Sequence, residues 1–492
     1  QYTQLIARRI RECKVYSEII SCFSPLEAIC ARNPSGIILS GGPSSVYHKK
    51  FLWDRDFFSI GVPILGLCYG MQLVAYLFSG KVKIAERQEY GRKILKIKRS
   101  SPIFDGLDHE IVVWMSHGDE VVEAPPNAEV IASTDTSAIA AFQMKNIFCL
   151  QFHPEVTHTP QGMQIFKNFL FKVCRVRDDW TMKNFINEKV AEIRTRVGNG
   201  CVACALSGGV DSAVVAMLVN RAIGNRLCAF FIDNGLLRKG EVREVRDFFK
   251  AYLNLKVIRA SNRFLKRLKG IIQPEAKRKL IGREFIRVFE DEAKKVEGIK
   301  FLAQGTLYPD VIESGQGIGP SSVIKSHHNV GGLPRKMGLK LIEPLRELFK
   351  DEVRVLSGEL GLPDVVTFRK PFPGPGLAIR IVGEVTEERL RLLREADFIL
   401  QEEASKFPIY KDIWQIFAIL LPVKSVGVKG DARTYQSVCV IRGVNSEDGM
   451  TADWAKLPDQ LLERVASRIA NEVGGINRVV FDVTSKPPAT IE

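Results

Sequence analysis

Three short apolar runs in this chain end in glycine-rich turns and pass into stretches with helical patterning. Residues 37–39 run into Ser40-Gly41-Gly42-Pro43, residues 62–65 into Gly66-Leu67-Cys68, and residues 201–206 into Ser207-Gly208-Gly209. A buried strand that stops at a turn before a helix is the repeating unit of an α/β domain. The pattern therefore predicts α/β layers whose functional turns follow the strands.

The 492 residues exceed one ordinary domain, and two to four domains are expected. A polar stretch at 175–180 and a Pro/Gly cluster at 371–376 mark the boundaries. We predict α/β domains at 1–176 and 177–370 and an α+β domain at 371–492. The segments that support this division are strands near 201–206, 227–232, 255–259 and 300–304, a charged helix near 386–405, and β-rich stretches near 423–443 and 477–484.

The net charge of +14 favours an anionic partner. We find no basic run interleaved with aromatics and no zinc-finger spacing, so nucleotides are favoured over nucleic acid. No stretch reaches about 18 uninterrupted apolar residues, so no membrane span is expected. The ten cysteines are scattered, which indicates a reducing, cytoplasmic compartment rather than a disulfide framework. The lone Cys201–Cys204 pair is interpreted as core.

The run Gly66-Leu67-Cys68-Tyr69-Gly70-Met71-Gln72 joins an apolar strand to a helical stretch at 73–78. Glycines permit a sharp turn that exposes a nucleophile at the end of a sheet. A helix amino terminus favours thiolate over thiol, and backbone N–H groups there can hold an oxyanion. Cys68 is therefore a candidate nucleophile, although a cysteine between glycines alone would mostly be a buried core residue.

A second motif, His153-Pro154-Glu155, follows the apolar run at 147–150. A cysteine nucleophile needs a base, and the base needs an orienting group. A lone histidine is more often structural, but here an acid stands two residues away in a compact loop. The two motifs together predict a catalytic triad.

These motifs resemble class I glutamine amidotransferases. The resemblance implies that Cys68 attacks the side-chain amide of glutamine, that His153 is the acid/base and that Glu155 orients it. It also implies an oxyanion hole from the N–H groups of Gly42 and Tyr69. The glutamine-binding residues that it implies are Gln72, Ser116 and His117, the last two within the segment Trp114 to Asp119.

The run Ser207-Gly208-Gly209-Val210-Asp211-Ser212 follows a strand and opens a helical stretch at 213–218. Glycine N–H groups, serine hydroxyls and the helix start suit a phosphate. Asp211 could help to place Mg²⁺, which takes few protein ligands. No Walker A sequence occurs in the chain. The loop resembles that of the N-type ATP pyrophosphatases, which implies an adenine-nucleotide α-hydrolase-like fold and cleavage of ATP between the α- and β-phosphates, with residues 207–212 binding the pyrophosphate.

Further segments resemble the GMP synthetase family over nearly the whole chain: 231–240, 277–282, 304–310, 327–334, 371–376, 428–435 and 484–492. The resemblance implies glutamine, ATP and xanthosine monophosphate (XMP) as substrates and a C-terminal domain that forms a homodimer. It implies XMP contacts from Arg278, Asp431, Arg433, Gln436, Lys486 and Glu492. Arginine and lysine suit phosphate, and carboxylates accept hydrogen bonds from ribose or base. Because family chains usually carry an apolar strand before the segment that starts at Gln1, we expect that this chain is part of a longer molecule.

Two other hypotheses use the same residues. One keeps both sites but changes the acceptor to another small molecule or a tRNA base. The C-terminal segment 486–492 argues against it, because such enzymes would not be expected to carry that segment. The other is a non-enzyme that retains nucleotide binding. The joint presence of the triad with Ser207 and Asp211 argues against that hypothesis, since a scaffold need not keep all five.

Overall fold

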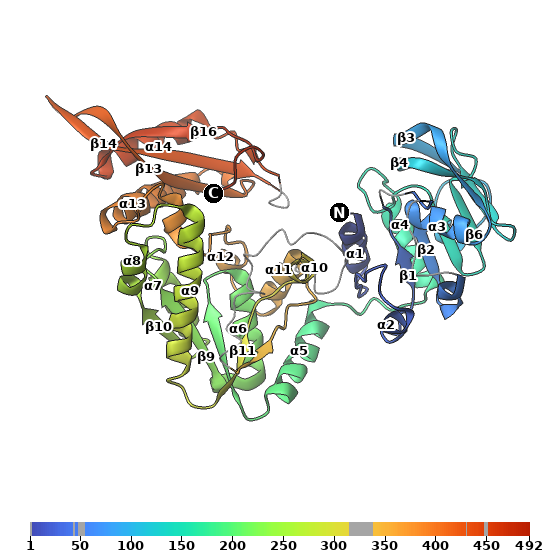
Figure 1. The fold of residues 1–492 in the computed structure, drawn as a ribbon, viewed down its shortest axis with the longest axis horizontal. Helices are drawn as coiled ribbons and strands as arrows, with labels where there is room; N and C mark the ends of the chain where they lie inside the picture. Colours follow the sequence, from blue (N-terminus) through green and yellow to red (C-terminus); the bar gives the residue numbers. More distant parts are fainter. Residues whose placement is uncertain (1, 43–44, 48–54, 314–337, 430, 447–450) are drawn as a thin grey trace. The chain divides into compact units, whose positions relative to one another are not determined.

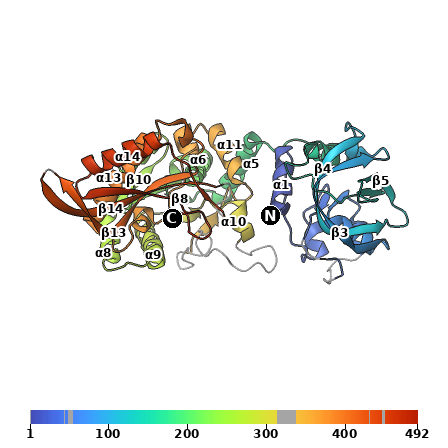
Figure 2. The same ribbon diagram turned by 90° about the horizontal axis from the view of Figure 1, so that it is seen from above.

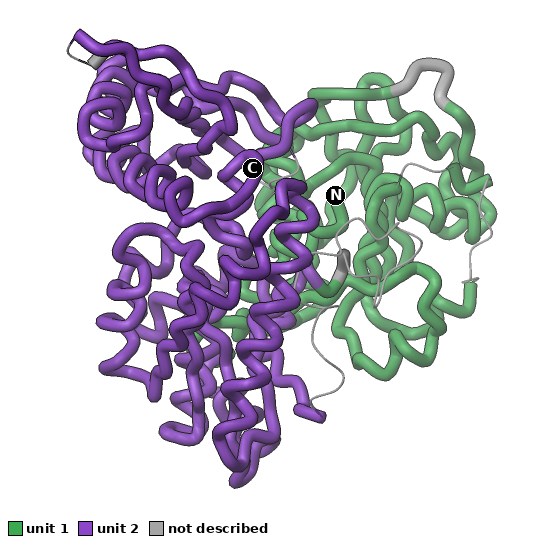
Figure 3. Tube along the Cα trace, turned by 60° about the vertical axis from the view of Figure 1, so that its left-hand side comes forward, with its two compact units in different colours: residues 1–185, 311–325 green, residues 186–310, 326–492 purple. Residues whose placement is uncertain are grey.

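The computed structural model describes residues 2–42, 45–47, 55–313, 338–429, 431–446 and 451–492. Pro43, the segment 327–334 and Gly430 of the motifs above lie outside these ranges. The chain forms two compact units, residues 1–185 with 311–325, and residues 186–310 with 326–492 (Figure 3). Both units combine a sheet with covering helices, so the predicted α/β fold class is confirmed.

Unit 1 contains a seven-stranded sheet in the order β1-β2-β7-β6-β5-β3-β4. Figure 1 labels five of these strands, β1, β2, β3, β4 and β6. Its first three strands are parallel, and every later pair is antiparallel. The strands are β1 (Ile37–Leu39), β2 (Ile64–Leu67), β3 (Lys81–Ile97), β4 (Glu110–Glu123), β5 (Glu129–Ser133), β6 (Ala141–Met144) and β7 (Ile147–Leu150). The helices are α1 (Tyr2–Glu12), α2 (Leu26–Cys30), α3 (Tyr69–Leu77) and α4 (Gly162–Lys167), and α5 (Met182–Val197) runs across the division at residue 185.

Both faces of the parallel part of this sheet are buried. Along β2, Leu65 and Leu67 face one apolar cluster, which includes residues of α1 and α4, while Ile64 faces a second cluster that includes residues of α3. Strand residues point alternately to opposite faces, so a strand covered on both sides must be apolar throughout. This explains why β2, at 64–67, carries no polar residue.

Unit 2 holds two further sheets (Figure 2). The first is parallel, in the order β10-β9-β8-β11-β12, and the second joins the long β13–β14 hairpin to β15 and β16. The strands are β8 (Cys201–Leu206), β9 (Leu227–Asp233), β10 (Leu255–Arg259), β11 (Ile299–Ala303), β12 (Lys340–Ile342), β13 (Gln415–Lys429), β14 (Ala432–Asn445), β15 (Asp453–Trp454) and β16 (Ile476–Asp482). The helices are α6 (Val210–Ile223), α7 (Glu241–Phe249), α8 (Ser261–Leu268), α9 (Pro274–Ala293), α10 (Tyr308–Glu313, which crosses the division at residue 310), α11 (Lys350–Glu359), α12 (Asp364–Thr367), α13 (Glu387–Ala404) and α14 (Asp459–Glu472).

One apolar core runs through both sheets of unit 2. It contains Phe230 of β9, Leu393 of α13 and Ile441 of β14. The predicted domains 177–370 and 371–492 therefore lie on one side of the division into compact units and share buried side chains. Their separation into two domains stays a prediction.

Candidate active sites

Cys68 occupies a strained turn between β2 and α3. Its backbone has φ 51° and ψ −105°, a positive φ that residues with a side chain rarely adopt. Its N–H donates to the carbonyl of Leu150 on β7 at 2.7 Å. Helix α3 begins at Tyr69, earlier than the sequence pattern indicated, because this turn leads directly into the helix. The sulfur therefore lies at the amino terminus of α3, as predicted.

Two glycines let the chain pack closely around this turn. A Cβ at Gly70 would lie 2.3 Å from the carbonyl oxygen of Leu39, and one at Gly66 would lie 2.9 Å from the backbone of Gly70. Backbone atoms cannot yield to such contacts as a flexible side chain can. The flanking glycines are therefore required by packing, and they hold β1, β2 and α3 together at the nucleophile.

His153 and Glu155 form a buried pair in the loop after β7. The Nδ1 atom of His153 lies 2.7 Å from Oε1 of Glu155, and the His153 N–H donates to the Trp114 carbonyl at 3.0 Å. Thr159 donates its hydroxyl to the carbonyl of His153 at 2.8 Å. The imidazole is thereby held from both its ring and its backbone, as a base with an orienting acid requires.

Gly41 lies between the nucleophile and the base. A Cβ built on Gly41 would lie 3.2 Å from Cε1 of His153 and 3.5 Å from Cβ of Cys68, so the two side chains flank one small space. Burial opposes the charge on the imidazole, but interactions with Cys68 and Glu155 outweigh it and raise the pKa of His153 to about 10. A cationic imidazole beside a cysteine is the arrangement that activates cysteine nucleophiles.

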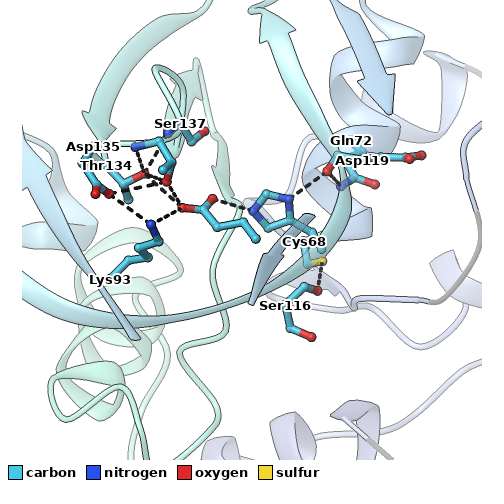
Figure 4. Close-up of polar contacts among 11 residues, drawn as sticks. Cys68, Gln72, Lys93, Ser116, Asp119, Thr134, Asp135 and Ser137 are labelled. Atoms are coloured by element: carbon cyan, nitrogen blue, oxygen red, sulfur yellow. Dashed lines mark hydrogen bonds and ion pairs between the residues drawn. The ribbon is translucent and has the colours of Figure 1, made fainter. Parts of the chain in front are cut away.

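The segment predicted to bind glutamine lies against this turn (Figure 4). The thiol of Cys68 faces the carbonyl of Ser116 at 3.7 Å. The side-chain amide of Gln72 donates to the carbonyl of Asp119 at 2.7 Å. His117 is buried, and both of its ring nitrogens are engaged, by the Asp119 carbonyl and by Glu89. A Cβ on Gly42 would lie 3.7 Å from the Tyr69 ring, so the two residues are neighbours, and the oxyanion role of their N–H groups stays a prediction.

The second glycine turn joins β8 to α6. Gly208 has φ 79°, and Gly209 directly precedes the helix. The hydroxyls of Ser207 and Ser212 lie 3.0 Å apart, and the Ser212 hydroxyl also receives the N–H of Ser207 at 3.1 Å. The Val210 side chain is buried, so only its backbone can face a ligand. This loop has the strand–turn–helix form of a phosphate site.

Three charged residues around this loop were not singled out by any sequence motif: Lys350, Arg369 and Glu241. Lys350, at the start of α11, lies 2.6 Å from both carboxylate oxygens of Asp211. Arg369 donates to the Gly208 carbonyl and to the Glu241 carboxylate, each at 2.8 Å. These contacts come from segments far along the chain, so only the tertiary fold could reveal them.

The six residues predicted to contact XMP lie on three segments of unit 2. Arg278 is on α9, Asp431, Arg433 and Gln436 are in or beside the β13–β14 turn, and Lys486 and Glu492 are in the C-terminal segment. The Glu492 carboxylate accepts from the buried Arg380 at 2.6 Å. The sequence did not single out Arg380. Their assembly into one site stays a prediction.

Tyr2 was also missed as a site residue. Its ring lies 4.9 Å from the His153 ring, measured between centroids. No local sequence pattern indicated this contact, because it joins residues far apart in the chain. The described residues contain no group of three or more histidine, cysteine or acidic side chains that could hold a metal, and no helix among them is long and apolar enough to cross a membrane.

A cysteine on a strand–turn–helix elbow, backed by a buried His-Glu pair on a mixed seven-stranded sheet, defines a class I glutamine amidotransferase domain. The family model "Glutamine amidotransferase class-I" matches residues 1–173, and "GMP synthase C terminal domain" matches residues 402–492. The chain is 56% identical to the GMP synthase [glutamine-hydrolyzing] of Caldicellulosiruptor saccharolyticus and 56% identical to that of Aquifex aeolicus, in each case over 100% of this chain and 97% of the relative. The chain belongs to the family of glutamine-hydrolysing GMP synthases.

Proposed function

We propose that this chain makes GMP from XMP, ATP and glutamine. The observation that carries the proposal is the presence, on one chain, of the Cys68–His153–Glu155 centre and of a glycine loop at the start of α6. The first centre suits the release of ammonia from an amide, and the second suits the pyrophosphate of a nucleotide. Family membership along the whole chain supports the combination.

In the first half-reaction, the Cys68 thiolate attacks the side-chain carbonyl of glutamine. The N–H groups of Gly42 and Tyr69 stabilise the oxyanion, and His153 gives its proton to the leaving nitrogen. The carbon–nitrogen bond breaks, ammonia leaves, and a thioester remains on Cys68. Water, deprotonated by His153, then hydrolyses the thioester to glutamate and restores the thiol. Glu155 keeps the imidazole oriented throughout.

In the second half-reaction, the O2 oxygen of XMP attacks the α-phosphate of ATP and pyrophosphate leaves. Ammonia then attacks C2 and displaces AMP, which is a better leaving group than an oxo oxygen. The N–H groups and hydroxyls of residues 207–212 hold the pyrophosphate. Asp211 fits the single carboxylate that a protein often supplies to Mg²⁺ when phosphates supply the rest. Bound there, Mg²⁺ would neutralise charge on the leaving pyrophosphate, and Lys350 would have to release Asp211.

The XMP contacts proposed are Arg278, Asp431, Arg433, Gln436, Lys486 and Glu492. Their charges support phosphate binding by the basic members and hydrogen bonding to ribose or base by the acidic ones. We further propose three domains at 1–176, 177–370 and 371–492, supported by the three separate sheets. The ten cysteines are all free, which supports a reducing compartment, the cytoplasm.

We propose that the β13–β14 hairpin makes a homodimer. Val426 and Tyr435 are cross-strand partners, and with Val428 they expose apolar surface, at 52%, 63% and 76% respectively. Apolar side chains gathered on a sheet face favour association. Changing Val426 and Val428 to Asp should turn a dimer into a monomer in analytical ultracentrifugation. A parent chain that sediments as a monomer would contradict the proposal.

An acceptor screen tests the proposed function. The chain is incubated with ATP, glutamine and each of XMP, IMP, a small carboxylic acid and tRNA, and the release of AMP is measured. We expect AMP release only when XMP is the acceptor. The product should be GMP, with either glutamine or ammonium as the nitrogen donor. AMP release with a different acceptor, or none with XMP, would overturn the assignment.

A further inference from the structure

The histidine of the glutamine-binding segment points into the protein rather than toward a substrate. Along β4, the side chains of Ile111, Val113 and Met115 are buried in the apolar cluster shared with α1 and α4. Because strand residues alternate between faces, His117 continues this buried row, and its side chain is only 2% exposed. A polar ring at such a position must find hydrogen-bond partners inside the protein.

Both partners of His117 are acceptors. Its Nε2 atom lies 3.0 Å from Oε2 of Glu89, which stands directly opposite on β3, and its Nδ1 atom lies 3.0 Å from the carbonyl oxygen of Asp119. A carbonyl oxygen has no proton, so Nδ1 must donate, and the Nε2–Oε2 contact needs a second proton. The pair therefore holds two protons and no net charge, and no ring nitrogen of His117 remains for a ligand.

Glu89 is held as firmly as His117. Its carboxylate accepts from the hydroxyl of Thr136, and the ammonium group of Lys93 lies 3.7 Å from Oε1. Burial opposes the charge of Glu89, but hydrogen bonds from His117 and Thr136 and the nearby positive charges outweigh it and lower its pKa. The carboxylate is therefore fixed at the end of a hydrogen-bonded chain rather than free to rotate.

The backbone beside His117 contacts the cysteine elbow directly (Figure 4). On one side, the Ser116 carbonyl faces the Cys68 thiol at 3.7 Å. On the other, the Asp119 carbonyl that accepts from His117 also accepts from Gln72, a residue of α3, at 2.7 Å. A shift of this segment would move the groups that flank the nucleophile, and such shifts are costly for catalysis.

We propose that Glu89 and His117 form a buried positioning pair, which fixes the segment from Ser116 to Asp119 against the Cys68 elbow. In this role His117 acts through the backbone of its own segment and is not a ligand of glutamine. The inference rests on the proposed glutaminase reaction and adds two positioning residues to it.

The test compares Glu89→Ala, Glu89→Gln and His117→Ala in the full chain. Initial rates of glutamate formation give kcat and KM for glutamine, and GMP synthesis from ammonium reports on the rest of the enzyme. Glu89→Ala and His117→Ala should each lower kcat for glutamine by about 10- to 100-fold, because the nucleophile loses its alignment. Glu89→Gln keeps the length and a hydrogen bond to Nε2, so its kcat should stay within about threefold of the parent. The matched control is Glu110→Ala, an exposed glutamate elsewhere on β4.

Other roles for His117 and Glu89 predict different effects on kcat and KM. If His117 binds glutamine, His117→Ala raises KM with kcat unchanged and Glu89→Ala resembles the parent. If the Glu89 carboxylate takes part in chemistry, Glu89→Gln is as damaging as Glu89→Ala. Either pattern overturns the proposal, as does a loss of ammonium-dependent synthesis equal to the loss with glutamine, which would indicate a general folding defect. A parent chain without glutaminase activity would instead overturn the proposed function.

Discussion

The two proposed reaction centres of this chain are built in opposite ways. The proposed glutaminase centre is buried. His153 contacts Glu155 at 2.7 Å, a Cβ on Gly41 would lie 3.2 Å from His153 and 3.5 Å from Cys68, and all three side chains are almost inaccessible. The loop proposed to bind phosphate is less buried, and its side-chain oxygens bond to each other or to Lys350. Covalent catalysis by one side chain needs alignment before the substrate arrives. A phosphate site instead needs donors that can exchange partners when the anion binds.

Cys68→Ala should have the largest effect. Without its nucleophile, glutamine-dependent GMP synthesis should fall by about 10⁴-fold or more. Synthesis from added ammonium should persist, because the phosphate loop is on a different sheet. Measuring GMP with each nitrogen donor tests the independence of the two centres, and equal losses with both donors would contradict it.

Asp211→Ala should impair the ATP-dependent reaction and spare the glutaminase reaction, which is the opposite of the result expected for Cys68→Ala. The loop would lose its carboxylate, and conversion of ATP to AMP should fall on the order of 100-fold. Basal glutaminase activity should survive, because no described contact of the triad involves Asp211. An AMP-release assay and a glutamate assay on the same preparation provide the measurement. Normal AMP release would remove Asp211 from the proposed site.

Gly70→Ala and Gly209→Ala compare the packing of the two turns. A Cβ at Gly70 meets the Leu39 carbonyl at 2.3 Å, whereas the nearest atom to a Cβ at Gly209 is the Ser207 hydroxyl oxygen at 3.5 Å. We expect Gly70→Ala to lower the unfolding free energy of unit 1 by about 1–3 kcal/mol. Gly209→Ala should leave the stability of unit 2 near that of the parent. Urea unfolding followed by tryptophan fluorescence measures both, and equal effects would mean that the two turns are equally tolerant.

Glu155→Gln should also shift the pH profile of the glutaminase reaction, and this shift is the smallest of the effects expected. The Glu155 carboxylate helps to raise the pKa of His153, so neutralising it lowers that pKa. The imidazole then loses its proton at a lower pH, and the alkaline decline of glutaminase activity should begin about one pH unit or more below that of the parent. Rates of ammonia release between pH 6 and 10.5 provide the measurement. An unchanged alkaline limb, as expected for the control Glu110→Gln, would argue that Glu155 does not act on the imidazole.

Several secondary-structure elements could be predicted because the local sequence determines them. The strands at 201–206 and 255–259, and the helix near 386–405, follow from apolar runs and periodicity, and the structure contains each of them. The cysteine elbow and the His153–Glu155 pair were also predicted, because each is formed by residues that are adjacent in the sequence. The structure places Cys68 and His153 on either side of Gly41.

The remaining contacts depend on register and long-range folding. The Glu89–His117 pair requires the antiparallel alignment of β3 with β4, which includes an irregularity between Ile84 and Glu89. No local pattern fixes that register. The alternation of buried residues along β4 did offer a signal, since it places His117 in the same row as Met115. No comparable sequence signal marked Lys350 or Tyr2, because each approaches its site from a distant segment.

The continuous core of unit 2 has a consequence for how genes of this kind can be divided. Among the described residues, the two apolar clusters of unit 1 lie between Ile6 and Val176, so a break in the coding sequence after them would cut neither cluster. A break near residue 371 would separate Phe230 from Leu393 and Ile441, and both products would expose surfaces that belong together. A chain divided near residue 185 would therefore keep these clusters whole, whereas a chain divided near residue 371 would not.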